Sequence, residues 1–232
     1  MPGESLVRFV LDPNPGPPPF ARADLYRVFT RKIHLDILEV AFPRFLSAMG
    51  RRRLEEMMDS FLEMKGPRTL QYPCVPDEFL AWAASSGHPA HELLNYERAA
   101  VRAERHPAEL DHLYAPGQDE RGRLNPTVDV FVTAEPVHTI ATDPSASPSS
   151  HGPYVYLCWR RPRTDELARQ RVGPLLGRAL GLLGVEALTR EAWLHRALEE
   201  ESADPEVYRE ALLDLHRELV SREGILRAGD PD

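Results

Sequence analysis

The chain has 232 residues and a formal net charge of −8, a length that suits one or two domains with a real hydrophobic core. The negative charge disfavours broad nucleic-acid binding and binding to anionic membranes, since both depend on surface Lys and Arg. No apolar run is long enough to span a bilayer. Met1–Pro19 is rich in proline and lacks the apolar region of a signal peptide, so we expect a cytoplasmic protein.

Residues 1–21 hold the run LDPNPGPPPF, which cannot be helical, and we expect an extended N-terminal arm. Residues 22–114 then carry apolar side chains at helical spacing and predict a helical domain. Its expected helices are Asp24–Ala41, Pro43–Met49, Arg51–Met64, Pro76–Ser86 and His91–Arg105, with a further turn or two over His106–Tyr114.

The first two of these helices meet at Phe42, because Pro43 lacks an N–H and pushes the residue before it out of the helical conformation. Gly50 is placed to end the second helix. Along the first helix one apolar stripe is expected to face the core. Its members are Leu25, Phe29, Ile33, Ile37 and Val40.

Residues 115–126 (APGQDERGRLNP) are polar and rich in turn-forming residues, so we place a domain boundary and linker there. From residue 127 the apolar period changes to two, which is typical of strands. The expected strands are Thr127–Thr133, Pro136–Ala141 and Tyr154–Arg160, and Glu166–Val172 is either a helix or a returning hairpin strand.

Three helices follow, over Pro174–Leu183, Arg190–Glu199 and Pro205–Arg222, and Gly224–Leu226 is a candidate last strand. Thr189 is the expected cap of the second helix, and Asp204 begins the third. The sequence therefore predicts an α+β protein. Its N-terminal part is a helical domain, and residues 127–232 form a winged-helix-like domain with a small antiparallel sheet and three helices.

Catalytic motifs are not found. The sequence has no Gly-rich phosphate loop, no GxSxG and no CxxC. The best cluster of possible metal ligands, His88, His91 and Glu92, reads as the N-terminus of a helix with His88 as its cap. Cys74 and Cys158 lie far apart in the sequence and are expected to be two free thiols. We therefore predict no catalytic residue, no metal site and no cofactor in this chain.

The order of landmarks between Tyr26 and Glu104 resembles one bacterial family. The landmarks are Leu25-Tyr26-Arg27, Ala41-Phe42-Pro43, Met49-Gly50, Phe61-Leu62 before Gly66-Pro67, Phe79-Leu80, and Leu93 to Ala99. The strands Val128–Ile140 and Tyr154–Arg161 also fit. The family comprises partner proteins of multinuclear non-heme iron-dependent oxidases, which modify ribosomally made peptides, often at cysteine. It is also labelled a putative DNA-binding domain.

The resemblance implies that the oxidase holds the iron and that this chain binds the precursor peptide and docks on the oxidase. The side chains of Tyr96, Glu97 and Arg98 are a candidate docking face. The alternative is that Glu97 only pairs with a nearby arginine inside the helical domain. A longer loop over Thr142–Pro153 departs from the family pattern and leaves the particular peptide open.

The peptide is expected to bind as an added strand at a sheet edge. The candidate strand is the one formed by Tyr154, Val155, Tyr156, Leu157, Cys158 and Trp159. The alternative is that this strand is central, with both faces in the core, and that Val128–Thr133 is the edge.

Two other classes of function remain open from the sequence. A winged-helix transcriptional regulator needs clustered Arg or Lys on its reading helix, whereas Arg190–Glu199 and Pro205–Arg222 are mixed or acidic. A stand-alone enzyme is disfavoured by the missing catalytic motifs.

Overall fold

The computed structural model describes residues 9–10, 16–64, 66–67, 71–110, 116, 120–140, 152–199 and 205–228. The chain forms two compact units, one of Met1–Arg98 with Pro136–Ser150 and one of Ala99–Glu135 with His151–Asp232. The fold class is α+β, as predicted, with helices, a three-stranded sheet and a two-stranded sheet. None of the helices in the described ranges is long and apolar enough to cross a membrane.

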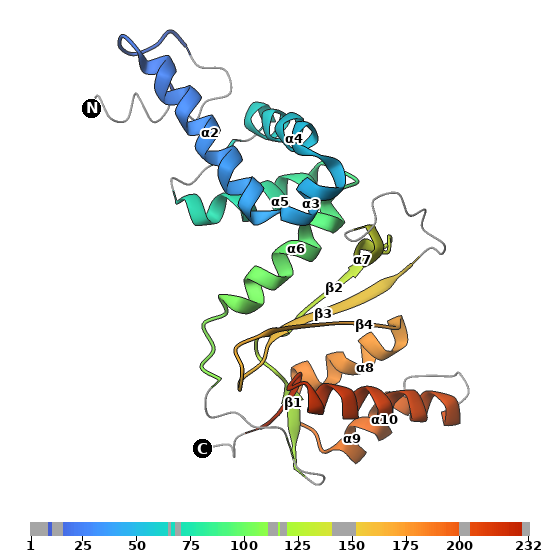
Figure 1. The fold of residues 1–232 in the computed structure, drawn as a ribbon. Helices are drawn as coiled ribbons and strands as arrows, with labels where there is room; N and C mark the ends of the chain where they lie inside the picture. Colours follow the sequence, from blue (N-terminus) through green and yellow to red (C-terminus); the bar gives the residue numbers. More distant parts are fainter. Residues whose placement is uncertain are drawn as a thin grey trace. The chain divides into compact units, whose positions relative to one another are not determined.

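The helical unit contains the predicted helices in the predicted order (Figure 1). They are α2 (Ala23–Ala41), α3 (Pro43–Met49), α4 (Arg51–Met64), α5 (Val75–Ser85), which follows the 3-10 turn Tyr72–Cys74, and the first part of α6 (His91–Glu104). Pro43 is the first residue of α3, and Gly50, with φ of 79°, ends it. A cluster of aromatic rings fills the core, with ring centroids 5.4–6.0 Å apart between Phe42, Phe61, Phe79 and Trp82.

The apolar stripe predicted to face the core along α2 is largely the exposed side of this helix. Val40 is 82% exposed and Phe29 60% exposed, whereas His34, Leu35 and Leu38 are buried. The reason is that α2 carries apolar residues on two sides, and the rest of the unit packs against only one of them. Periodicity shows that an apolar side exists but not which one is covered.

Three segments in the middle of the chain differ from expectation. The predicted linker contains β1 (Gly122–Leu124), which pairs with β5 (Ile225–Arg227), the strand expected near the C-terminus. Residues 106–110 are not helical, and the remainder of the expected turn after α6 lies largely outside the described residues. The piece expected to be extended from Pro136 is the short helix α7 (Val137–Ile140), because the N–H of Thr139 bonds back to the carbonyl of Pro136 at 2.8 Å.

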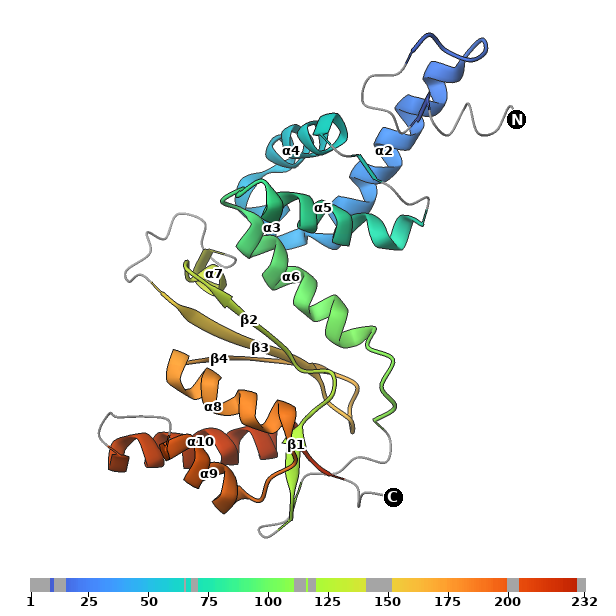
Figure 2. The ribbon, with the colours of Figure 1, turned by 180° about the vertical axis from the view of Figure 1, so that it is seen from behind.

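In the second unit β2 (Asp129–Thr133), β3 (Tyr154–Arg160) and β4 (Leu167–Val172) form an antiparallel sheet in the order β2-β3-β4. The ambiguous segment is therefore the returning strand. The predicted helices follow as α8 (Pro174–Val185), α9 (Arg190–Glu199) and α10 (Pro205–Ser221), and they lie on one side of the sheet (Figures 1 and 2). Thr189 caps α9, since its hydroxyl accepts the N–H of Ala192 at 3.2 Å. Asp204 lies outside the described residues.

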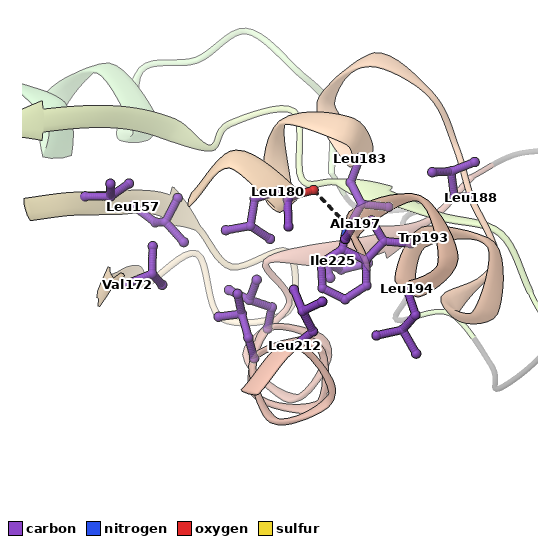
Figure 3. Close-up of a cluster of buried hydrophobic side chains, with 14 of the residues drawn as sticks. Leu157, Val172, Leu180, Leu183, Leu188, Trp193, Leu194, Ala197, Leu212 and Ile225 are labelled. Atoms are coloured by element: carbon purple, nitrogen blue, oxygen red, sulfur yellow. Dashed lines mark hydrogen bonds between the residues drawn. The ribbon is translucent and has the colours of Figure 1, made fainter. Parts of the chain in front are cut away.

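The core of this unit lies between the sheet and the three helices (Figure 3). Trp193 on α9 is fully buried, and its indole N–H donates to the carbonyl of Ala179 on α8 at 2.7 Å. Val155, Leu157 and Trp159 supply the β3 side of this core. Gly177 lets α8 approach β3 closely, because a Cβ there would meet the Val155 side chain at 2.9 Å.

His216 on α10 makes the stability of this unit depend on pH. Its ring lies 5.6 Å from that of Trp193, and burial, followed by the nearby charge of Arg190, lowers the pKa of His216 from 6.5 to about 4. Between these two values the unfolded chain binds more protons than the folded chain, so stability falls as the pH drops from 6.5 towards 4. We expect the melting temperature to fall more steeply over this window in the wild type than in His216→Gln. The melting temperature is followed by tryptophan fluorescence.

The matched control is His195→Gln, which removes an exposed imidazole from α9 and is expected to keep the wild-type pH profile. If His216→Gln and the wild type lose the same number of degrees between pH 6.5 and 4, burial of His216 is not the cause of acid sensitivity.

Candidate functional site

The strand predicted to receive a peptide is the central strand of the sheet. Each residue from Tyr154 to Arg160 pairs with a neighbour on β4, β2 or both, and Val155 to Trp159 are at most 5% exposed. Both sides of β3 are therefore occupied, and no peptide can add to it. The structure has the alternative arrangement, in which β3 is central and β2, within the predicted Val128–Thr133, is an edge strand.

The two faces of β3 have different neighbours. Val155, Leu157 and Trp159 point towards the helices, and Tyr156 and Cys158 lie on the other face. On that face the ring of Tyr156 stacks on Phe131 of β2 with centroids 5.5 Å apart. Burial raises the pKa of the Cys158 thiol above its ordinary value, so this cysteine stays protonated and is a poor nucleophile.

The direction of the backbone groups along β2 follows from one hydrogen bond. The N–H of Arg160 donates to the Thr127 hydroxyl at 3.0 Å, so this end of β3 turns its N–H towards β2. Because backbone direction alternates along an antiparallel ladder, Asp129, Phe131 and Thr133 point their N–H and C=O groups at β3. Val130 and Val132 therefore point theirs away from the sheet.

The opposite edge, β4, is already partly occupied. The same alternation turns the backbone groups of Leu167, Arg169 and Arg171 outwards. The carbonyl of Arg169 accepts a hydrogen bond from the guanidinium of Arg222 at 3.0 Å, which also confirms the assignment of inward and outward residues. Charged side chains on an edge strand are a common protection against strand addition. This makes β4 the less suitable edge.

The β2 edge lacks this protection. Within the described part of the chain, no hydrogen bond joins the outward backbone groups of Val130 and Val132 to another residue. Their side chains are 43% and 58% exposed, although they share a face with the buried Leu157 and Val155 opposite them. The layer of helices thus covers β3 and leaves β2 partly bare. A strand added at β2 would meet backbone donors and acceptors together with apolar side chains.

The start of β2 is held in place by Asn125, which is 1% exposed. Its side-chain amide donates to the carbonyls of Arg160 and Glu223, at 2.8 and 3.0 Å. Its side-chain oxygen accepts from both the N–H and the hydroxyl of Thr127, at 2.9 and 2.8 Å. The sequence does not identify Asn125, because an Asn before a Pro in a polar stretch indicates only a turn.

Three further contacts hold the two ends of the strand. Arg102 on the last turn of α6 binds the carboxylate of Asp129 at 2.6 Å. At the far end the Thr133 hydroxyl donates to the carbonyl of Glu135 at 2.6 Å, and the N–H of Gly152 donates to the carbonyl of Ala134 at 3.0 Å. Both ends of β2 are therefore held in place, so the strand itself has less conformational entropy to lose when a peptide binds.

The predicted docking face on α6 consists of buried side chains with partners inside the helical unit. Tyr96, Glu97 and Arg98 are 8%, 5% and 5% exposed. The Glu97 carboxylate accepts the N–H groups of Arg44 and Phe45 at 2.6 and 2.8 Å. It therefore binds backbone groups at the start of α3, inside its own unit.

The other two residues of this face also bind their own unit. Arg98 makes a bidentate pair with Asp77, with both N···O distances 2.6 Å. The ring of Tyr96 lies under the guanidinium of Arg44. Docking through these three side chains remains a prediction, but it would require groups that already stabilise the unit.

The histidines at the start of α6 bind neighbouring groups. The Nδ1 of His88 accepts the N–H of Ala90, the residue just before α6, at 3.1 Å, and its Nε2 lies 3.2 Å from the guanidinium of Arg53. Burial, followed by that guanidinium, lowers the pKa of His88 below its ordinary value. In the ranges that the structure describes, no three His, Cys, Asp or Glu side chains are grouped to hold a metal ion. Cys74 and Cys158 are free thiols.

Comparison with known proteins adds no relative. No protein-family model matches the chain, and no curated protein matches it. The likeness to oxidase partner proteins therefore rests on the landmarks in the sequence alone.

Proposed function

We propose that this chain is a non-catalytic partner protein that binds a ribosomally made precursor peptide as an added strand along β2. We propose that it presents this peptide to a multinuclear non-heme iron oxidase, which would hold the iron and modify the peptide at a cysteine. The observation that carries the peptide-binding part is the anchored β2 edge, with outward backbone groups and exposed valines at 130 and 132. The oxidase part rests on the sequence resemblance.

The charges on the three helices support this proposal over a transcriptional regulator. Arg196 on α9 pairs with Glu186, Arg217 on α10 pairs with Asp214, and Arg222 pairs with Glu218 at 3.2 Å. Arginines that are paired with carboxylates on their own surface add little net positive charge for phosphate binding. A helix built to read DNA would need the opposite balance.

Proline substitution at an outward position tests the strand addition. Val132→Pro removes an N–H that β3 does not use, and its ring blocks the approach of another strand. We expect this variant to fold and to bind the peptide at least about tenfold more weakly, since a hydrogen bond and the close approach of the strand are both lost. The probe is the peptide encoded by the short cysteine-containing reading frame beside the gene, fluorescently labelled, and binding is measured by anisotropy.

The matched control is Leu167→Pro, an outward position at the start of β4, which is expected to bind the peptide like the wild type. Both variants are expected to co-purify with the oxidase encoded nearby, because docking and peptide binding use different surfaces. If Val132→Pro is well folded and binds normally, strand addition at β2 is wrong. If no oxidase gene and no such reading frame neighbour the gene, the oxidase assignment is wrong.

A further inference from the structure

The helix α2 has a second apolar side that the helical unit covers only at Ile37, which is partly buried against the core. Tyr26, Phe29, Ile33, Ile37 and Val40 follow one another at intervals of three or four residues, so they lie along one side of the helix. Tyr26 is 53%, Phe29 60% and Val40 82% exposed. Both views show the N-terminal half of α2 extending past α4 and α5 (Figures 1 and 2). We call these five residues the α2 stripe.

This stripe is unusual for a surface helix. His34, Leu35 and Leu38 already provide a buried side that packs into the unit. A helix that is apolar on two sides normally has a partner on each of them. The neighbouring Leu25 and Val28 are also 49% and 63% exposed, so the apolar surface at this end of α2 is not limited to the stripe.

The charges beside the stripe indicate what kind of partner fits. Lys32 and Asp36 are one helical turn apart on the same flank of the stripe, and both are exposed. In the residue ranges that the structure describes, neither side chain has an ion-pair or hydrogen-bond partner. Two copies of α2 packed antiparallel, with a two-fold axis halfway between these residues, would place Lys32 of each copy opposite Asp36 of the other.

A two-fold axis of this kind keeps the same flank of each helix on the same side of the pair. Lys32 and Asp36 lie on one flank at equal distances from the axis. This flank of one copy is therefore complementary in charge to the same flank of the other copy. The aromatic N-terminal half of the stripe would at the same time pack on Ile37 and Val40 of the other copy. Self-complementary charge beside an apolar stripe is what a symmetric interface requires.

We propose that the α2 stripe is the interface of a homodimer, in which the α2 helices of two chains pack antiparallel and exchange two Lys32–Asp36 ion pairs. The proposal does not depend on the proposed function, because it concerns the association of the chain with itself in the absence of peptide and oxidase.

A charge exchange tests this pairing. Sedimentation equilibrium of the full chain between about 1 and 100 μM is expected to show a monomer–dimer equilibrium for the wild type. Lys32→Glu and Asp36→Lys are each expected to raise the dimer dissociation constant at least about fivefold, since like charges then meet twice. The double variant Lys32→Glu/Asp36→Lys is expected to restore the wild-type value.

Phe29→Asp provides the second arm, because it places a charge in the centre of the stripe at an exposed position and is expected to leave a folded monomer. Val185→Asp, on an exposed valine of the other unit, is the matched control and should dimerise normally. A wild type that is monomeric at every concentration, a double variant that stays as weak as the single ones, or a dimer that survives Phe29→Asp would each overturn the proposal.

Discussion

Replacing Glu97 by Ala is expected to lower the free energy of unfolding of the helical unit by about 3 kcal/mol, because it removes the acceptor of one buried and one partly buried backbone N–H group. Pro43 starts α3, so the N–H groups of Arg44 and Phe45 have no acceptor within the helix. Phe42, which occupies the capping position, makes no side-chain cap bond. The Glu97 carboxylate on α6 supplies what the local sequence lacks, at 2.6 and 2.8 Å.

Urea unfolding followed by far-UV circular dichroism measures this loss. Glu97→Gln keeps one acceptor and is expected to lose less than Glu97→Ala. Glu104→Ala removes an exposed acid from the same helix and is the matched control, with an expected change within about 0.5 kcal/mol. Equal loss in the Glu97→Ala and Glu104→Ala variants would contradict the capping role.

This result also bears on how oxidase docking can be tested. A Glu97→Arg variant would bury a positive charge against two N–H donors at the start of a helix, where the helix dipole favours an anion. Its failure to co-purify with the oxidase would then reflect unfolding as much as a lost contact. Docking is better tested with exposed positions of the helical unit.

The sequence predicts the elements of this fold well, because most of them carry their own boundary signals. Pro43 and Gly50 delimit α3, Thr189 begins α9, and the β-branched and aromatic residues of Tyr154–Arg160 mark β3. These signals act within a few residues, so they can be read without knowing the rest of the molecule.

Two errors are local, since the piece expected to be extended from Pro136 is helical and residues 106–110 are not helical. The other errors concern relations between elements. The apolar sides of α2 look alike in the sequence, and only the packing of the other helices decides that Leu38 is buried and Val40 exposed. Likewise, the high strand propensity of β3 marks it as a strand but does not give its neighbours. The strand β3 is central because β4 returns as a hairpin strand on the side of β3 opposite to β2. Glu97 forms hydrogen bonds with residues 52 and 53 positions away, and Asn125 forms one with a residue 98 positions away. No local sequence pattern shows such contacts.

Replacing Asn125 by Ala is expected to destabilise the second unit by about 3 kcal/mol and to loosen the β2 edge at the same time. The side chain makes hydrogen bonds with Thr127 and with the carbonyls of Arg160 and Glu223. The substitution leaves these buried groups without a partner and removes the link between the start of β2, the end of β3 and the turn before β5. Asn125→Asp distinguishes the role of the amide oxygen from that of the amide NH2. It keeps the acceptor for Thr127 but places a carboxylate oxygen against the two carbonyl oxygens to which the NH2 donates.

We therefore expect Asn125→Asp to be at least as unstable as Asn125→Ala, whereas Arg123→Ala, an exposed neighbour on β1, should unfold like the wild type. Unfolding is measured by the fluorescence of Trp159 and Trp193, both buried in this unit. If Asn125→Asp is as stable as the wild type, the bonds to Arg160 and Glu223 contribute nothing to stability. Because β2 is the proposed peptide edge, amide hydrogen exchange at Phe131 and Thr133, whose N–H groups point at β3, should also become faster in the Asn125→Ala variant, and peptide affinity should fall with it.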